Sequence, residues 1–418
     1  MNAPEFLDHQ TLDLTQSSQL AQDLIGLAQA SGLRPLRIKG KTLVPVVQGG
    51  MGVGVSAGGL AGSVARLGGI GTISSVDLRR LHPDLMAATA DAPASQNPRE
   101  IFDRANLIAL DREISRAREL ADGQGLIAIN IMKALSAYEL YVRHALQAGI
   151  DALVVGAGLP LDLPDLARDF PDTALIPILS DARGVQLVVK KWEKKGRLPD
   201  AIVIEHPRLA GGHLGAAKVA DLNDTRFDFD QVIGPVLEFF ETAGYSKEIP
   251  LIAAGGISSL EDIQRLQALG YAAVQLGTAF AVTRESDAAP AFKATLANAK
   301  PEDVVEFISV AGLPARAVKT PWLEKYLRIE DKLKSVAHVK SKGCNLALDC
   351  LAHCGLRDGV SAMGQFCIDR QLGHALEGDT DRGLYFRGAG KLPFGDQIRS
   401  VEELLKCLLG GLRPAGSM

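Results

Sequence analysis

A chain of 418 residues is too long for one small domain, and it suits a barrel of about 250 residues or more with an extension. A formal net charge of -4 gives no electrostatic reason to expect binding to nucleic acid or to a membrane surface. Because 47% of the residues are hydrophobic, the chain can bury a large core without disulfides.

The amino-terminal segment, residues 1–35, contains acidic residues and lacks the apolar stretch of a signal peptide. No uninterrupted apolar run reaches the ~18 residues that a membrane span needs. We therefore expect a cytoplasmic protein, in which cysteines are reduced, catalytic or metal-bound. The expected partner is a small-molecule substrate, and a homo-oligomer is compatible with the sequence.

Short apolar runs alternate with longer amphipathic segments through most of the chain. The runs with strand character are Val44–Gln48, Ile70–Ser74, Leu126–Ile131, Ala152–Val155, Leu175–Leu179, Ala201–Ile204, Leu251–Ala254 and Ala272–Leu276. Segments with helical spacing lie between them, such as Tyr138–Leu146, Val185–Glu193, Val232–Glu241 and Leu260–Leu269. Eight near-continuous apolar strands separated by helices predict an α/β protein, a closed (β/α)₈ TIM barrel over residues 36–316.

Two segments depart from this repeat. Ser75–Ala105 is long and polar and contains prolines; because it follows the second strand, we expect a loop that covers the catalytic face. Residues 317–418 hold a cysteine cluster, a Gly-rich stretch (Arg387-Gly-Ala-Gly-Lys391) and an amphipathic helix, Val401–Leu409. We expect them to form a C-terminal extension packed against the barrel, not an independent domain.

Glycines follow the last two predicted strands. Gly255 and Gly256 come after the seventh, and the eighth ends in Gln275-Leu-Gly277-Thr278. Such glycines let backbone N–H groups approach an anion, and this position in a barrel is the usual place for a phosphate. An isolated Gly-Gly pair is more simply a tight turn, but two loops at neighbouring strands favour a phosphate site.

The loop after the first strand narrows the choice of ligand. Gly49, Gly50 and Met51 place flexible backbone and a soft apolar side chain at the barrel mouth, which suits one face of an isoalloxazine ring. Asn130, at the end of the third strand, can offer an amide donor and acceptor to the pyrimidine edge of such a ring. The alternative for Asn130 is a structural role, in which its side chain only caps a loop.

One histidine is distinguished by its surroundings. Gly211 and Gly212 would bring the backbone close to a ligand and leave His213 pointing into the barrel mouth. A histidine titrates near neutrality, so it can take a proton from a carbon acid or give one to an enolate. The alternatives are a satisfied structural histidine and simple hydrogen bonding to a ligand.

The segments QGGMG, AINIM, AGGHLG, AAGGI and QLGTAF resemble, in order and spacing, the nitronate monooxygenase (2-nitropropane dioxygenase-like) flavoproteins, which include the K-type enoyl-acyl carrier protein reductases. The resemblance runs from about Leu36 to Arg316. It implies FMN contacts near Gly49–Met51, Asn130 and Gly211, with His213 as catalytic acid/base. It also implies that the FMN phosphate is bound at Gly255, Gly256, Gly277 and Thr278. Many members have Glu before the Ala-Gly-Gly-His run, where this chain has Leu209, so the resemblance carries over the flavin site but not nitronate oxidation.

Four of the five cysteines, with the spacing C-x5-C-x3-C-x12-C, are Cys344, Cys350, Cys354 and Cys367. Four thiolates suit a [4Fe–4S] cluster or a tetrahedral zinc ion, and the x5 and x3 spacings favour iron–sulfur. The third hypothesis is that no metal binds, because free cysteines are often small buried hydrophobes. Cys407 is expected to pack inside its apolar helix.

These patterns predict an FMN-dependent oxidoreductase. The first hypothesis is oxidation of a nitronate or a similar small carbon acid with O₂. The alternative is NAD(P)H-dependent reduction of an electron-poor alkene (enoyl thioester) or a quinone, using FMN and an iron–sulfur cluster. A hypothesis of another class is a non-flavin, phosphate-binding barrel isomerase or lyase, which would need neither Gly49–Met51 nor the cysteines.

Overall fold

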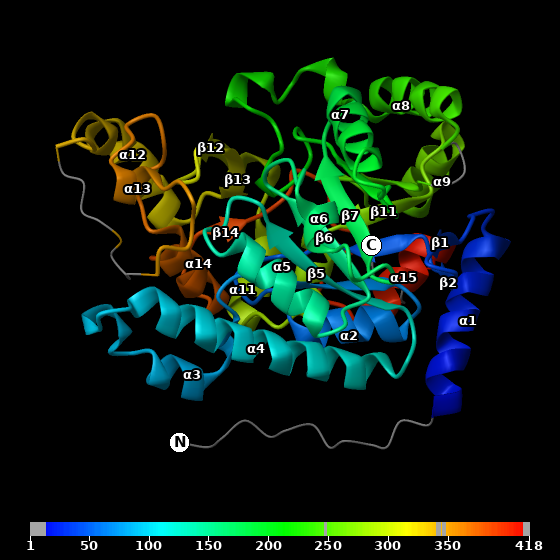
Figure 1. Ribbon diagram of the computed structural model, residues 1–418, viewed down its shortest axis with the longest axis horizontal. Coiled ribbons are helices and arrows are strands. Elements are labelled where there is room, and N and C mark those ends of the chain that lie inside the picture. Colours follow the sequence, from blue (N-terminus) through cyan, green and yellow to red (C-terminus); the bar gives the residue numbers. More distant parts are fainter. Residues whose placement is uncertain (1–13, 246–248, 340–343, 345–347, 413–418) are drawn as a thin grey trace.

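The computed structural model describes residues 14–245, 249–339, 344 and 348–412. Its centre is a closed barrel of eight parallel strands (Figure 1). Around the barrel these are β3 (Val46–Gln48), β4 (Ile70–Ser74), β5 (Leu126–Met132), β6 (Ala152–Gly156), β7 (Ala174–Leu179), β8 (Ile202–Glu205), β10 (Leu251–Ala254) and β11 (Ala273–Leu276). The eight predicted strands are these eight, within two residues at each end, so the (β/α)₈ prediction is confirmed.

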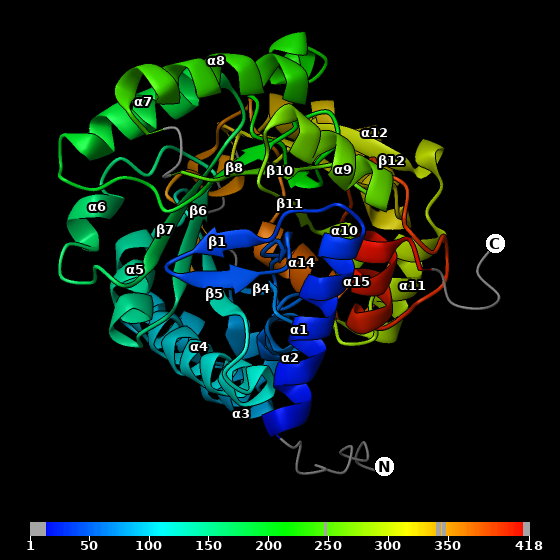
Figure 2. The same cartoon turned by 90° about the vertical axis from the view of Figure 1, so that its right-hand side faces the viewer.

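Each barrel strand is followed by a helix on the outside, and Figure 2 shows these helices as a ring around the strands. In chain order they are α2 (Gly58–Arg66), α4 (Pro98–Ala121), α5 (Tyr138–Gln147), α6 (Leu163–Leu166), α7 (Ala182–Glu193), α8 (Phe229–Ala243), α9 (Leu260–Leu269) and α10 (Thr278–Ala281). The predicted helices correspond to α5, α7, α8 and α9. Ser259 caps α9, since its side chain accepts a hydrogen bond from the backbone N–H of Asp262 at 3.2 Å.

The strands are apolar on both faces because both faces are buried. Alternate residues such as Val47, Ile70 and Val154 fill the barrel interior, whereas their neighbours pack against the helices. A hairpin of β1 (Leu36–Ile38) and β2 (Lys41–Leu43) adds its apolar side chains to the interior cluster and closes the amino-terminal end. The other end of the barrel is therefore the one left for a ligand.

The two termini of the described chain meet on one flank of the barrel. Helix α1 (Leu14–Ala30) packs against α15 (Val401–Gly410), where Gly410 approaches Leu27 so closely that a Cβ would lie 2.6 Å from its Cδ1. Cys407 is buried in α15, as predicted. Helices α1 and α15 thus stabilise each other.

Apart from α15, the helices of the C-terminal extension lie on the opposite side of the barrel from α1 and the β1–β2 hairpin (Figure 1). Its helices are α12 (Pro321–Ser335), α13 (Gly355–Asp358) and α14 (Ile368–Leu376), and α11 (Pro290–Asn298) precedes it. A second sheet joins β12 (Val304–Ile308), β13 (Pro314–Val318) and β14 (Tyr385–Phe386) to β9 (Gly212–His213). The predicted boundary at residue 316 falls inside β13, so the extension and the barrel share a sheet.

The segment Ser75–Ala105, expected to be a loop over the catalytic face, is mostly helical. The segment contains α3 (Pro83–Ala88) and the start of α4, with 3₁₀ turns at Leu78–Leu81 and Ala92–Ala94. Its polar composition was misleading because α4, which packs against α2, buries one face that includes Phe102, Ala105 and Leu110 and exposes polar side chains on the other. Among the described helices, none is long and apolar enough to cross a membrane.

Candidate active site

A cavity of about 290 Å³ lies at the carboxyl ends of the barrel strands. It is walled by barrel loops on one side and by the extension on the other. All twelve residues predicted for the cofactor and the catalytic histidine line it: Gly49, Gly50, Met51, Asn130, Gly211, Gly212, His213, Gly255, Gly256, Gln275, Gly277 and Thr278. The structure therefore brings together residues that five separate segments of the sequence supply.

The loop after β3 is shaped by close backbone packing. A Cβ on Gly50 would lie 2.3 Å from the Cβ of Asn130, and one on Gly49 would lie 3.3 Å from the Gln275 side chain. Asn130 donates through Nδ2 to the carbonyl of Val154 at 3.2 Å, which fixes its amide in the cavity wall. Only glycine therefore fits at position 50. The buried Oε1 atom of Gln275 has no hydrogen-bond partner among the described residues.

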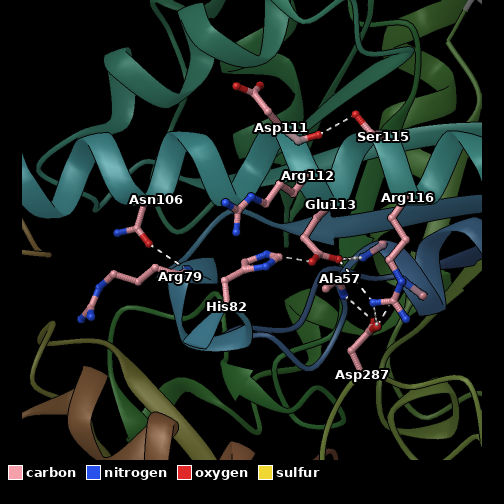
Figure 3. Close-up of polar contacts among 12 residues, drawn as sticks. Ala57, Arg79, His82, Asn106, Asp111, Arg112, Glu113, Ser115, Arg116 and Asp287 are labelled. Carbon is pink, nitrogen blue, oxygen red and sulfur yellow. Dashed lines mark hydrogen bonds and ion pairs between the residues drawn. The ribbon is translucent and has the colours of Figure 1, made fainter. Parts of the chain in front are cut away.

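Buried carboxylates hold this loop through the helix that follows it (Figure 3). Asp287 accepts hydrogen bonds from the backbone N–H groups of Ala57 at 2.9 Å and Leu60 at 3.0 Å, and its other oxygen contacts Arg116 at 3.0 Å. Glu113 accepts from the N–H of Gly58 at 2.8 Å. These bonds satisfy the free N–H groups of the first turn of α2, and the positive end of the helix dipole favours the negative charge.

Glycines from three segments meet at the ends of β10 and β11. Gly255 and Gly256 have φ angles of 111° and 74°, in the left-handed region that favours glycine. Gly388, in the extension, donates its N–H to Thr278 Oγ1 at 3.0 Å, and a Cβ on Gly390 would lie 3.0 Å from the Cα of Gly256. The predicted phosphate loops are thus covered by the Gly-rich stretch 387–391.

The Gly-rich stretch 387–391 was recognised in the sequence, but no role was predicted for it. Arg387 is buried and lines the cavity, where it donates to the carbonyls of Leu296 at 3.0 Å and Gly388 at 2.9 Å. Burial lowers the pKa of its guanidinium, and no carboxylate among the described residues contributes to that pKa. Lys391 is exposed and lines the same cavity. The only signal in the sequence was two basic residues flanking closely spaced glycines.

His213 is fixed by the sheet that joins barrel and extension. Its backbone pairs with Ala315 of β13, and its Nε2 lies 3.0 Å from Ser309 Oγ, which also accepts the N–H of Ala311 at 3.2 Å. Arg316 forms an ion pair with Glu306 at 2.5 Å and donates to carbonyls of the preceding loop. Burial lowers the pKa of His213 to about 4, so its ring is neutral at physiological pH.

The cysteine segment borders the same cavity. Cys350 lines it, and Leu351 bridges to Leu135 in the loop after β5. Burial raises the pKa of the Cys350 thiol, and the nearby Asp369, Cys367, Cys354 and Cys344 raise it further. Burial likewise raises the pKa of Cys367 to about 11. The four predicted metal ligands therefore lie within electrostatic reach of one another, but no three His, Cys, Asp or Glu side chains in the described ranges are arranged to hold a metal ion.

A closed parallel barrel with a cavity at its carboxyl ends, glycine loops at its last two strands and a half-buried neutral histidine is the architecture of a barrel enzyme. Comparison with known proteins gives its family. A model of the nitronate monooxygenase family matches residues 35–411. The chain belongs to this family, and it is an oxidoreductase.

Individual relatives are distant. A probable nitronate monooxygenase from Staphylococcus saprophyticus is 24% identical over 298 residues, which cover 69% of this chain and 79% of that protein. Among solved structures, FabK from Thermotoga maritima superposes with a TM-score of 0.59 at 22% identity, covering 93% of this chain and 94% of its own. Nitroalkane oxidase from Streptomyces ansochromogenes superposes with a TM-score of 0.56 at 19% identity, covering 88% and 94%. These structural likenesses show the fold.

Proposed function

We propose that the chain is an FMN-dependent oxidoreductase that oxidises a nitronate, or a similar small carbon acid, with O₂. The observation that carries the proposal is the convergence of the three glycine segments, Arg387 and His213 on one cavity. Among the described residues, Arg387 is a buried cation without a carboxylate, and Gln275 Oε1 is a buried acceptor without a donor. Both fit FMN, since a phosphate dianion would pair with the cation and a ring N–H would satisfy the acceptor.

In this proposal the backbone and Arg387 position the cofactor. The N–H groups at Gly255, Gly256 and Gly277, with the Thr278 hydroxyl, would hold the phosphate, and Arg387 and Lys391 would neutralise it. Gly49, Gly50 and Met51 would leave room for a flat ring beside Asn130. FMN supplies the electron acceptor for substrate oxidation, and O₂ is the final oxidant.

The electrostatics of His213 favour one form of the substrate. A histidine with a pKa of about 4 is a weak base, so it is poorly suited to deprotonate a neutral nitroalkane. A nitronate has already lost that proton, and a neutral imidazole N–H can donate a hydrogen bond to its oxygen. The low pKa of His213 therefore supports a nitronate as the substrate in preference to its conjugate acid.

A second candidate is favoured by the cysteine segment. NAD(P)H-dependent reduction of an electron-poor alkene or a quinone could use an iron–sulfur cluster, which transfers single electrons, held by Cys344, Cys350, Cys354 and Cys367. The support for this candidate is that Cys350 lines the cavity and that the other three thiols are near enough to raise its pKa. A zinc ion held by the same thiols would serve structure without electron transfer.

The test is to purify the protein without oxygen and to record its absorption spectrum with iron and sulfide analysis. Flavin bands without iron, together with O₂ consumption on addition of a nitronate, are the expected result. Flavin bands with about four irons per chain would support the reductase candidate. A colourless protein that fails to bind added FMN would overturn both and leave a phosphate-binding isomerase or lyase.

A further inference from the structure

One carboxyl group in the cavity has no part in the function proposed so far. Glu205 is the last residue of β8, beside Ala254 of β10, and it lines the cavity. His213 follows it by eight positions on the same connection, so both side chains reach the cavity from one strand end. Over the residues that the structure describes, the Glu205 carboxylate has no hydrogen bond or ion pair, and it is half-buried in the cavity wall.

The residues that approach Glu205 most closely on the following loop and the preceding strand end, Gly215 and Ser180, are uncharged. Gly215, with a φ angle of 67°, passes close by: a Cβ there would lie 2.3 Å from Ser180 Oγ and 3.4 Å from Glu205 Oε2. The absence of a side chain at position 215 leaves room for the Ser180 hydroxyl and the Glu205 carboxyl group to approach this backbone. A hydroxyl can donate to a carboxylate, and it can donate to or accept from a protonated carboxyl group, so a nearby hydroxyl is compatible with either protonation state.

Charged groups on the surrounding elements are committed to other partners. After β7, Asp181 caps α7 by accepting the N–H of Gly184 at 2.7 Å. On the connection after β8, Arg208 and His206 both contact Asp228, at 2.5 Å and 3.0 Å. After β5, Lys133 pairs with Asp162 at 2.6 Å, and in the extension Asp369 pairs with Arg80 at 2.5 Å. Burial alone raises the pKa of Glu205 to about 7, with no contribution from any of these charges.

The charged side chains that line the cavity indicate how Glu205 could take part in binding an anion. The described lining has two cations, Arg387 and Lys391, and both stand at the glycine stretch that would hold the phosphate of FMN. The other charged groups are Glu205 and Asp369, and Asp369 already has Arg80 as its counter-ion. An anionic substrate would therefore meet an uncompensated negative charge unless Glu205 were protonated, because like charges in a buried site repel strongly.

We infer that Glu205 binds the anionic head of the substrate as a neutral acid, so that binding of the anion requires one proton on this residue. The O–H of the acid donates a hydrogen bond to an oxygen of the anion, and no covalent bond forms or breaks. The inference rests on the proposed function, because it takes the substrate to be a small anion and the two cations to be paired with the FMN phosphate. According to this inference, the affinity of the site for an anion depends on the protonation state of Glu205 and not on that of His213.

The test uses the oxidised holoenzyme and propionate, a planar O–C–O anion of the size of a small nitronate that does not reduce flavin. Propionate is ionised throughout the range from about pH 6 to about pH 8.5, and His213 stays neutral there, so neither titration interferes. The dissociation constant, measured from the perturbed flavin spectrum, should be constant below about pH 7 and weaken about tenfold per pH unit above it. Calorimetry in two buffers of different ionisation enthalpy should show uptake of one proton at the alkaline end.

Glu205→Gln should abolish this dependence, because an amide keeps an N–H donor and does not titrate. Its propionate affinity should be flat and close to the wild-type value at low pH. Glu238→Gln, an exposed change on α8, is the matched control and should keep the wild-type slope. If Glu205→Gln does not fold, calorimetry of the wild-type protein in the two buffers still tests whether binding of propionate takes up a proton.

Three results would overturn the inference: a flat wild-type profile without proton uptake, an unchanged slope in Glu205→Gln, or no propionate binding at pH 6. Different results would count against the proposed function itself. A flavin-free protein, or a flavoprotein inert toward nitronates, counts against that function. A nitronate-oxidising holoenzyme whose propionate affinity ignores pH removes only the role of Glu205.

Discussion

The barrel loops and the C-terminal extension line the same cavity with different chemistry. The barrel contributes glycine backbone, a neutral His213 and the carboxyl group of Glu205, whereas the extension contributes both cations, Arg387 and Lys391. The barrel therefore determines the shape of the site, and the extension supplies the positive charge that a phosphate needs. Neither part forms the site alone, so a substitution in one part tests its contribution while the other part stays intact.

The largest effect is expected on the barrel side, from His213→Ala. Because the imidazole would contact the substrate, its loss should lower kcat/KM for nitronate oxidation by ~10²–10⁴-fold, the usual size of acid/base and hydrogen-bonding effects at a reacting centre. FMN content should stay at the wild-type level, since the phosphate loops and the extension are untouched. Steady-state O₂ consumption and the flavin absorbance of the purified variant measure the two quantities.

His144→Ala is the control for this change, because His144 lies on the outer helix α5 and contacts Asp111 away from the cavity. It should leave both quantities unchanged. Turnover at the wild-type rate in His213→Ala would remove the histidine from the mechanism. The kcat/KM profile of Glu205→Gln should lack a step near the ordinary histidine pKa of 6.5, since burial lowers the pKa of His213 to about 4.

An intermediate effect is expected on the extension side, from Arg387→Ala. Removing a buried cation that pairs with a phosphate should weaken FMN binding by about tenfold to a hundredfold, because hydrogen bonds to charged groups contribute about 1.5–3 kcal/mol. Riboflavin lacks the phosphate, so its dissociation constant should barely change. Fluorescence titration of the deflavinated protein with both ligands gives the comparison.

Arg382→Ala is the matched control, since Arg382 is exposed on the same stretch of the extension and pairs with Asp379. It should bind both ligands like the wild type. Equal losses of FMN and riboflavin affinity in Arg387→Ala would instead show that Arg387 supports the fold of the loop and does not recognise phosphate.

The barrel and the extension also differ in how well their structure could be predicted from the sequence. Barrel strands are short apolar runs and their glycine loops follow at once, so local signals placed all eight strands and the twelve lining residues. Gly388 contacts Thr278, which is 110 positions away in the sequence, and Arg387 contacts Leu296, which is 91 positions away. The pairing of β9 with β13, which fixes His213, is equally non-local and involves a strand of two residues. Such pairings depend on the folded barrel, and no spacing in the sequence encodes them.

The smallest effect is expected behind the barrel loop after β3, from Asp287→Asn. The carboxylate caps the first turn of α2 behind the Gly49–Met51 loop, so loss of its charge should reduce the free energy of unfolding by about 1–3 kcal/mol. It should also weaken FMN and riboflavin alike by a few-fold, because the ring-facing loop loses its support and the phosphate end does not. Asp181→Ala removes the cap from α7, outside the cavity lining, and should destabilise the fold without changing either affinity. A preferential loss of FMN over riboflavin in Asp287→Asn would contradict the division of the site, because it would mean that the loop after β3 also controls phosphate binding.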